Sequence, residues 1–289
     1  MSAVVQLLIG GLTVGSIYGL IAIGFTTVYS ATGIVNFAQG DFAMLGALSA
    51  ISLHAAGLPL FAAVIAAIIL VGLVAVLIER VAIRPLGSQV TRGIIVTIGI
   101  GVILQGAAVL LWGTDAQPLP AFSGARPLSV WGATVVPQTL WIFGTAGGLM
   151  LLLYLFFERT YPGKVMRAAA INPFAAELMG IKLNAVRAFS FMLSGMIGAI
   201  GGIIVAPIVL TQYDSGISLG IKGFVACIIG GFGNPIGAAL GGLLLGVLEA
   251  MSSGLVSSGL KNAISFILLV LFLLLRPGGI LGDLERAKS

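Results

Sequence analysis

The sequence has little charge and lacks the residues on which most metal sites depend. Only 8% of its 289 residues are charged, whereas 59% are hydrophobic. This composition is typical of a helical protein that crosses a membrane several times, and not of a soluble domain. The single cysteine, Cys227, excludes an internal disulfide and a thiolate metal cluster, and the single histidine, His54, excludes a histidine-based metal site.

Common enzyme signatures are also missing. The chain has no HExxH motif, no paired catalytic aspartates and no nucleophile elbow. Gly163-Lys164 is followed by Val165 and lacks the glycine-rich loop of a Walker A motif. We therefore expect no enzymatic activity, no cofactor and no metal on this chain, and any ATP that drives it must be bound by partner subunits.

The net charge of +5 reflects basic residues gathered in three segments. These are Arg80, Arg84 and Arg92; Arg159, Lys164, Arg167, Lys182 and Arg187; and Arg276, Arg286 and Lys288. By the positive-inside rule all three segments face the cytoplasm. The charge therefore predicts topology and not a nucleic-acid partner: a multi-pass protein of the bacterial inner membrane, with an outside N-terminus and a cytoplasmic C-terminus.

About eight hydrophobic segments, some of them broken or re-entrant, predict one all-α transmembrane domain over residues 1–289. The segments are 4–28, 42–54, 60–78, 94–111, 139–157, 189–210, 218–253 and 263–275. Segment 218–253 is too long for one ordinary span, so we interpret it as a half-helix, a turn inside the protein at 230–235 and a returning helix. Glycines at four-residue spacing, such as Gly11, Gly15 and Gly19, predict close helix packing. Residues 113–137 contain four prolines and lie among the tryptophans Trp112, Trp131 and Trp141, so they predict an extracytoplasmic loop.

Two polar or glycine-rich turns interrupt the apolar segments, at 30–41 and 230–235. Irregular backbone at membrane depth is tolerated only where it is buried in protein or lines a watery cavity. The candidates for a substrate path are accordingly Asn36, Phe37, Gln39, Gly40, Asp41, Gly233 and Asn234. For Asp41 the alternative is a structural role at the start of the following helix.

Each turn precedes two spans, the second of which ends in Arg-Pro, at Arg84-Pro85 and Arg276-Pro277. This pattern predicts an internal repeat of the kind common in transporters, and chance similarity between glycine-rich segments is the alternative. Glu249 is the other acidic residue in an apolar stretch. We expect it to reach the outer interface beside Ser252 and Ser253.

The central polar segment, residues 158–187, contains a very short predicted helix. Asn172 is its N-cap, Pro173 its first residue and Gly180 its C-terminal stop. Phe174, Leu178 and Ile181 follow at i, i+4 and i+7, so they are expected to share an apolar face. Such a face needs a protein groove to cover it or, alternatively, the surface of the bilayer.

Five motifs, in this order along the chain, resemble the LivH-type permease family of branched-chain amino acid ABC importers. They are GIVNFAQGDFAMLG at 33–46, IERVAIRPL at 78–86, NPFAAELMGI at 172–181, GGFGNPIGA at 230–238 and PGGILG at 277–282. The resemblance implies a permease that works with a second, LivM-like permease, two cytoplasmic ABC ATPase subunits and an extracytoplasmic substrate-binding protein. It also implies that 158–187 is the coupling loop.

In that loop the resemblance assigns ATPase coupling to Phe174, Ala175, Ala176, Glu177, Leu178, Gly180 and Ile181. The family usually has Glu where this chain has Phe174, so an ion pair from that position is not expected, and Glu177 is a candidate to replace it. The expected function is inward transport of branched-chain or related hydrophobic amino acids. The alternatives are the same importer class acting on urea, short amides or other amino acids; a stand-alone carrier or channel, which would need an intramembrane ion site; and a membrane scaffold.

Overall fold

The structure is a computed structural model that describes residues 2–87, 89–124, 127–130, 133–255, 257, 259–276 and 278–282. Met1, the residue of the predicted outside N-terminus, lies outside the described residues, as do Trp131, Pro277, Arg286 and Lys288 of the predictions above.

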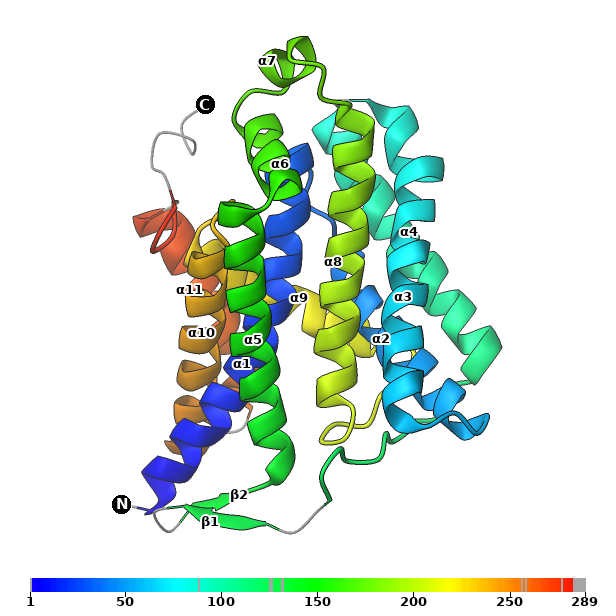
Figure 1. Ribbon diagram of the computed structural model, residues 1–289. Helices are drawn as coiled ribbons and strands as arrows, with labels where there is room; N and C mark the ends of the chain where they lie inside the picture. Colours follow the sequence, from blue (N-terminus) through cyan, green and yellow to red (C-terminus); the bar gives the residue numbers. More distant parts are fainter. Residues whose placement is uncertain are drawn as a thin grey trace.

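Helices account for nearly all of the regular structure (Figure 1). They are α1 (Ser2–Thr32), α2 (Gln39–Ala55), α3 (Leu60–Ile78), η1 (Glu79–Ile83), η2 (Arg84–Leu86), α4 (Val90–Trp112), α5 (Pro137–Arg159), α6 (Tyr161–Ile171), α7 (Pro173–Leu178), α8 (Leu183–Val205), α9 (Ser215–Gly230), α10 (Pro235–Leu255) and α11 (Leu260–Leu275). Within the described ranges, α1, α3, α4, α5, α8 and α10 are long and apolar enough to cross a membrane. The prediction of a polytopic helical protein is confirmed.

Two elements were not predicted. Strands β1 (Leu128–Val130) and β2 (Ala133–Val135) form a small antiparallel hairpin in which Leu128 lies opposite Val135. Helix α6 lies within the polar segment 158–187 and is separate from α5. The hairpin and the start of α1 lie at one end of the bundle, the hairpin end, and α7 lies at the other, the α7 end (Figure 1).

Glycines bring α1 and α10 into backbone contact. A Cβ atom added to Gly15 would lie 2.8 Å from the carbonyl oxygen of Gly242, and one added to Gly246 would lie 2.3 Å from the backbone of Gly15. Since lipid tails are as apolar as the helices, only close packing and polar contacts favour association, and small residues make both possible. The close packing predicted for the glycines of the first span is confirmed.

The short helices α2 and α9 begin side by side inside the bundle. A Cβ atom on Gly40 would lie 2.0 Å from the carbonyl oxygen of Gly216. From this junction α2 runs to the hairpin end, where Phe61 of the next helix contacts Phe122, and α9 runs to the α7 end, where Phe232 contacts Tyr29. The two short helices therefore point in opposite directions.

This junction identifies an internal repeat of inverted direction. Helix α1, the irregular segment 33–38, α2 and α3 correspond to α8, the segment 206–214, α9 and α10. The predicted matching of 36–41 with 230–235 is wrong. Residues 231–234 form the turn after the short helix α9, with positive φ at Gly231 and Gly233, whereas the equivalent of 33–38 is the irregular segment before it.

Candidate functional site

Helix α7 presents an exposed apolar tip at one end of the bundle (Figure 1). The side-chain oxygen of Asn172 accepts a hydrogen bond from the amide of Ala175 at 2.9 Å, which caps the helix as predicted. Phe174 and Leu178 are 71% and 74% exposed. Ala175 and Glu177 are also exposed, whereas Ala176 is buried against the body of the protein.

Ile181 does not share this exposed face, so that part of the prediction is wrong. The helix ends at Leu178, and Gly180, with a φ of +82°, reverses the chain. The amide of Ile181 then donates to the carbonyl of Ala176 at 3.0 Å, and its side chain packs against a buried cluster that includes Met166 and Val186. Met179, 83% exposed, extends the apolar tip instead. We call Phe174, Leu178 and Met179 the α7 tip.

Three of the predicted path residues are brought together in a closed polar joint. Asn36, Gln39 and Asp41 are 0%, 0% and 4% exposed. Gln39 donates to the carbonyl of Ser194 on α8 at 3.1 Å, and Asp41 accepts from Gln105 on α4 at 2.8 Å. This geometry joins α2 to two neighbouring helices, and no side-chain hydrogen bond caps the start of α2.

Two further predicted path residues complete the joint. Gly40 makes the contact with α9 described above, and the half-buried Phe37 packs against Phe224 with tilted rings at a centroid distance of 5.1 Å. The side-chain nitrogen of Asn36 is buried and has no hydrogen-bond partner among the described residues. A role of this joint in a substrate path stays a prediction.

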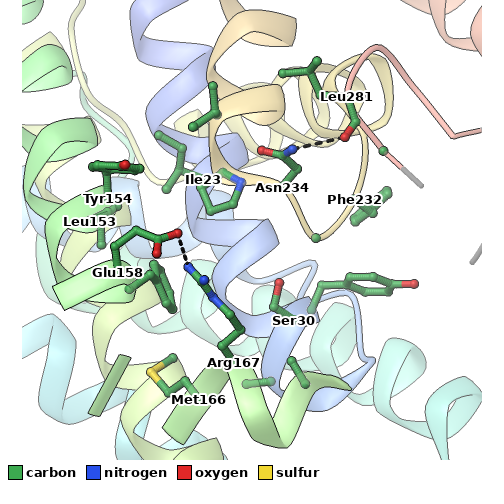
Figure 2. Close-up of a pocket in the computed structure, with 18 of the residues that line it drawn as sticks. Ile23, Ser30, Leu153, Tyr154, Glu158, Met166, Arg167, Phe232, Asn234 and Leu281 are labelled. Carbon is green, nitrogen blue, oxygen red and sulfur yellow. Dashed lines mark hydrogen bonds and ion pairs between the residues drawn. The ribbon is translucent and has the colours of Figure 1, made fainter. Parts of the chain in front are cut away.

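Gly233 and Asn234 lie elsewhere, on the wall of a pocket near the α7 end (Figure 2). The pocket has a volume of about 620 Å³ and lies between α1, α5, α6 and the turn that joins α9 to α10. Its walls are mostly apolar and include Ile23, Met150, Leu153, Phe157, Met166, Phe232, Ile236 and Leu281. None of the residues of the Asn36 joint lines it.

One ion pair faces this pocket. Arg167 of α6 lies 2.7 Å from Glu158 of α5, and the two side chains are 47% and 42% exposed. Figure 2 shows the guanidinium directed at the carboxylate across the pocket wall. The amide of Asn234 is held in place, since its nitrogen donates to the carbonyl of Leu281 at 3.1 Å and its oxygen accepts from the amide of Gly237 at 3.0 Å.

A second ion pair, buried inside the helical bundle, was missed by the sequence reasoning. Lys222 of α9 contacts Glu249 of α10, and the two side chains are 9% and 1% exposed. Glu249 also accepts hydrogen bonds from Tyr18 at 3.0 Å and from Ser265 of α11. The expectation that Glu249 reaches an outer interface is wrong. The available signal for this pair was the presence of one lysine and one glutamate inside the same apolar segment, 218–253. Charged residues buried in membrane helices pair with one another.

Comparisons with known proteins find transport permeases. A family model described as the permease component of branched-chain amino acid transport systems matches residues 7–273. The high-affinity branched-chain amino acid transport permease BraD of Pseudomonas aeruginosa is 35% identical over 98% of this chain and 97% of its own length. The corresponding LivH protein of Escherichia coli is 34% identical over the same shares.

A more distant relative carries a different name. The ribose import permease RbsC of Haemophilus influenzae is 27% identical over 81% of this chain and 73% of its own length. No solved structure matches the chain.

Proposed function

The chain belongs to the family of permease components of branched-chain amino acid transport systems, and on that premise we propose that it is the membrane-spanning subunit of an ABC importer for branched-chain amino acids. Its relatives are transport permeases and not enzymes. ATP is bound and hydrolysed by two separate cytoplasmic subunits. A second, LivM-like permease completes the passage, and an extracytoplasmic binding protein delivers the substrate.

The α7 end faces the cytoplasm in this proposal. Two of the three basic segments lie at this end, on α6 to α8 and on the η1, η2 and α4 connection (Figure 1). Basic residues in short loops are retained on the cytoplasmic side of a membrane. The start of α1 and the β hairpin then face outward, in the bacterial inner membrane.

The α7 tip is the observation that carries the proposal. Three large apolar side chains stand more than two-thirds exposed on a helix that is capped at its start and stopped by glycine at its end. An exposed apolar cluster on a fixed arm is typical of a surface that a partner protein covers. An ATPase subunit that grips this arm can move α6 and α8, which flank it in the chain.

The energetics require no chemistry from the permease itself. ATP shifts the balance between the inward-open and outward-open states only by the free energy with which it stabilises one state more than the other. A change from 1:99 to 99:1 needs about 5.5 kcal/mol, and nucleotide-driven closure of the ATPase subunits supplies it through the docked arm.

The substitution Phe174→Asp tests this docking directly. We expect the variant to insert into the membrane, to lose the co-purifying ATPase subunits and to lose uptake, because a charge replaces the apolar anchor. Leu128→Asp is the matched control, since Leu128 is also exposed, at 46%, but lies at the hairpin end. It should leave ATPase co-purification intact. Unchanged ATPase binding by Phe174→Asp would refute the docking surface.

Cross-linking adds a test that does not depend on loss of function. Cys227 is fully buried, so Met179→Cys introduces the one accessible thiol of the sequence. The proposal expects a bifunctional reagent to join this thiol to an ATPase subunit. Labelling by lipid-soluble reagents alone, in every nucleotide state, would instead place the tip on the bilayer.

Substrate class is tested by uptake with the cognate binding protein. Radiolabelled leucine, isoleucine and valine should be taken up, and urea and short amides should not. Uptake that persists after removal of the ATPase subunits would identify a stand-alone carrier instead.

A further inference from the structure

We propose that the pocket between α1, α5, α6 and the 231–234 turn binds one free amino acid with an aliphatic side chain, and that Glu158 and Arg167 recognise its charged groups. The inference rests on the proposed function, because it takes the α7 end as the side of release. It assigns ligand recognition to Glu158 and Arg167, which none of the five sequence motifs contains.

Size and wall chemistry favour a small ligand with an apolar part. A volume of about 620 Å³ falls in the range of roughly 300–1,000 Å³ that is usual for small-molecule sites. Leu153 and Phe157 of α5, Met166 of α6 and Ile236 of α10 offer aliphatic and aromatic surface from three sides. A branched aliphatic side chain removes such surface from water, whereas urea and sugars cannot do so.

The ion pair supplies charges of both signs at one point of the wall. A free amino acid carries an ammonium and a carboxylate on the same carbon, so it can bind Glu158 with the first and Arg167 with the second. Both side chains are nearly half exposed, so they are accessible to a ligand and opening their contact requires little desolvation. Charged hydrogen bonds to a carboxylate are among the stronger polar contacts, and arginine is well suited to make two of them.

Neighbouring polar groups are either held in place or free for the ligand. Asn234 is fixed by its two hydrogen bonds and cannot swing into the pocket without losing them. The hydroxyl groups of Ser30 and Tyr154 line the pocket and make no hydrogen bond within the described part of the chain (Figure 2). They remain available to the carboxylate or ammonium of the ligand.

The position of the pocket connects binding to the moving arm. One wall is α6, which lies directly before α7 in the chain, and the opposite wall is formed by α1 and the start of α10, which are locked together by their glycines. Movement of α7 therefore changes the width of the pocket. A weak amino-acid site there would empty when the arm moves.

Binding of radiolabelled L-leucine to the purified transporter, without ATP and without binding protein, tests the site. We expect saturable binding that isoleucine and valine displace. Two analogues each lack one charge: 4-methylpentanoate has no ammonium and 3-methylbutylamine has no carboxylate. Both should compete at least tenfold more weakly than leucine, because each leaves one partner of the ion pair unmatched.

Single substitutions should change this discrimination in a residue-specific way. Glu158→Gln should weaken leucine binding at least tenfold and abolish the preference over 4-methylpentanoate, and Arg167→Gln should abolish the preference over 3-methylbutylamine. A merely structural ion pair would not alter the ranking of analogues. Arg159→Gln and Lys164→Gln are matched controls, since both residues are exposed and neighbour the pair but do not line the pocket. They should bind leucine normally.

Filling the pocket gives an independent readout. Met150→Trp narrows it and should prevent leucine binding, whereas Leu151→Trp, on the exposed outer face of α5, should not. Leucine binding that survives Met150→Trp, Glu158→Gln and Arg167→Gln would overturn the site. A pocket occupied by phospholipid, shown by leucine binding that appears only after delipidation, would overturn it as well.

These results are separable from the proposed function. If leucine does not bind in the pocket, ATP-dependent uptake and the effect of Phe174→Asp are still expected. Failure of the importer proposal would instead appear as uptake without ATPase subunits.

Discussion

Two ion pairs of this protein each join a glutamate to a basic side chain but have opposite surroundings. Lys222–Glu249 lies in the interior region formed by α1, α9 and α10, whereas Glu158–Arg167 lies in the peripheral region formed by α5 and α6. The interior pair is almost fully buried and shares further hydrogen bonds with Tyr18 and Ser265. The peripheral pair is nearly half exposed and faces a pocket.

Glycines show the same contrast. In the interior, a Cβ on Gly246 would collide with the backbone of α1, whereas on α5 a Cβ on Gly147 would meet nothing within 4 Å. In the most apolar stretch of each helix, 67% of the residues are buried in α1 but only 11% in α5. The interior is therefore fixed by contacts within the chain, and the periphery keeps exposed surface.

The largest effect is expected from breaking the interior ion pair. Lys222→Met leaves the carboxylate of Glu249 buried without its counter-charge, which typically destabilises a protein by about 3–5 kcal/mol. The thermal unfolding midpoint of the purified protein should fall sharply.

The double variant Lys222→Met with Glu249→Leu is the control for that effect. It removes both charges, and an apolar replacement of a buried pair is often neutral, so most of the stability should return. Equal loss in the single and the double variant would show that the pair contributes through packing and not through charge.

A smaller effect is expected from the interior glycines. Gly246→Ala adds a methyl group 2.3 Å from the backbone of Gly15, which cannot move aside as a side chain can. Overpacking of this kind costs about 1–3 kcal/mol. Thermal unfolding of the variant measures it.

Gly147→Ala is the matched change in the periphery. It adds the same methyl group to open space on a helix, where alanine is favoured over glycine by roughly 1 kcal/mol in water. The contrast between interior and periphery fails if the two alanine variants have the same stability.

The sequence predicted the helices well where local signals define them. The predicted span 60–78 coincides with α3, Leu60–Ile78, because Pro59 precedes it and the charged Glu79-Arg80 follows it. Phe174 and Leu178 were correctly placed on an exposed face, because four residues make one helical turn. Ile181 was misplaced because the same spacing was applied beyond the end of the helix, past Gly180.

Other features depend on contacts between distant segments. Helix α6 was missed because its 11 residues carry three charged or polar positions among alanines and give no membrane-span signal. The pocket joins residues from separate helices, and no local pattern reports which helices meet. The Lys222–Glu249 pair was missed although both charges lie within the predicted segment 218–253. An internal repeat was expected, but its predicted matching was wrong, and the inverted correspondence became visible only through the junction between Gly40 and Gly216.

The smallest effect on stability is expected from the peripheral ion pair, and it separates folding from binding. Arg167→Gln removes a contact between two half-exposed side chains, which water replaces readily. The unfolding midpoint should stay at the wild-type value, and raising the salt concentration should not change it in either protein. Leucine binding should nevertheless fall, because the ligand carboxylate loses its partner. Lys222→Met likewise removes one positive charge, but from the interior. Equal destabilisation by the two variants would show that burial does not distinguish the two pairs. Glu158 and Arg167 would then stabilise the fold and would not be free to bind a ligand.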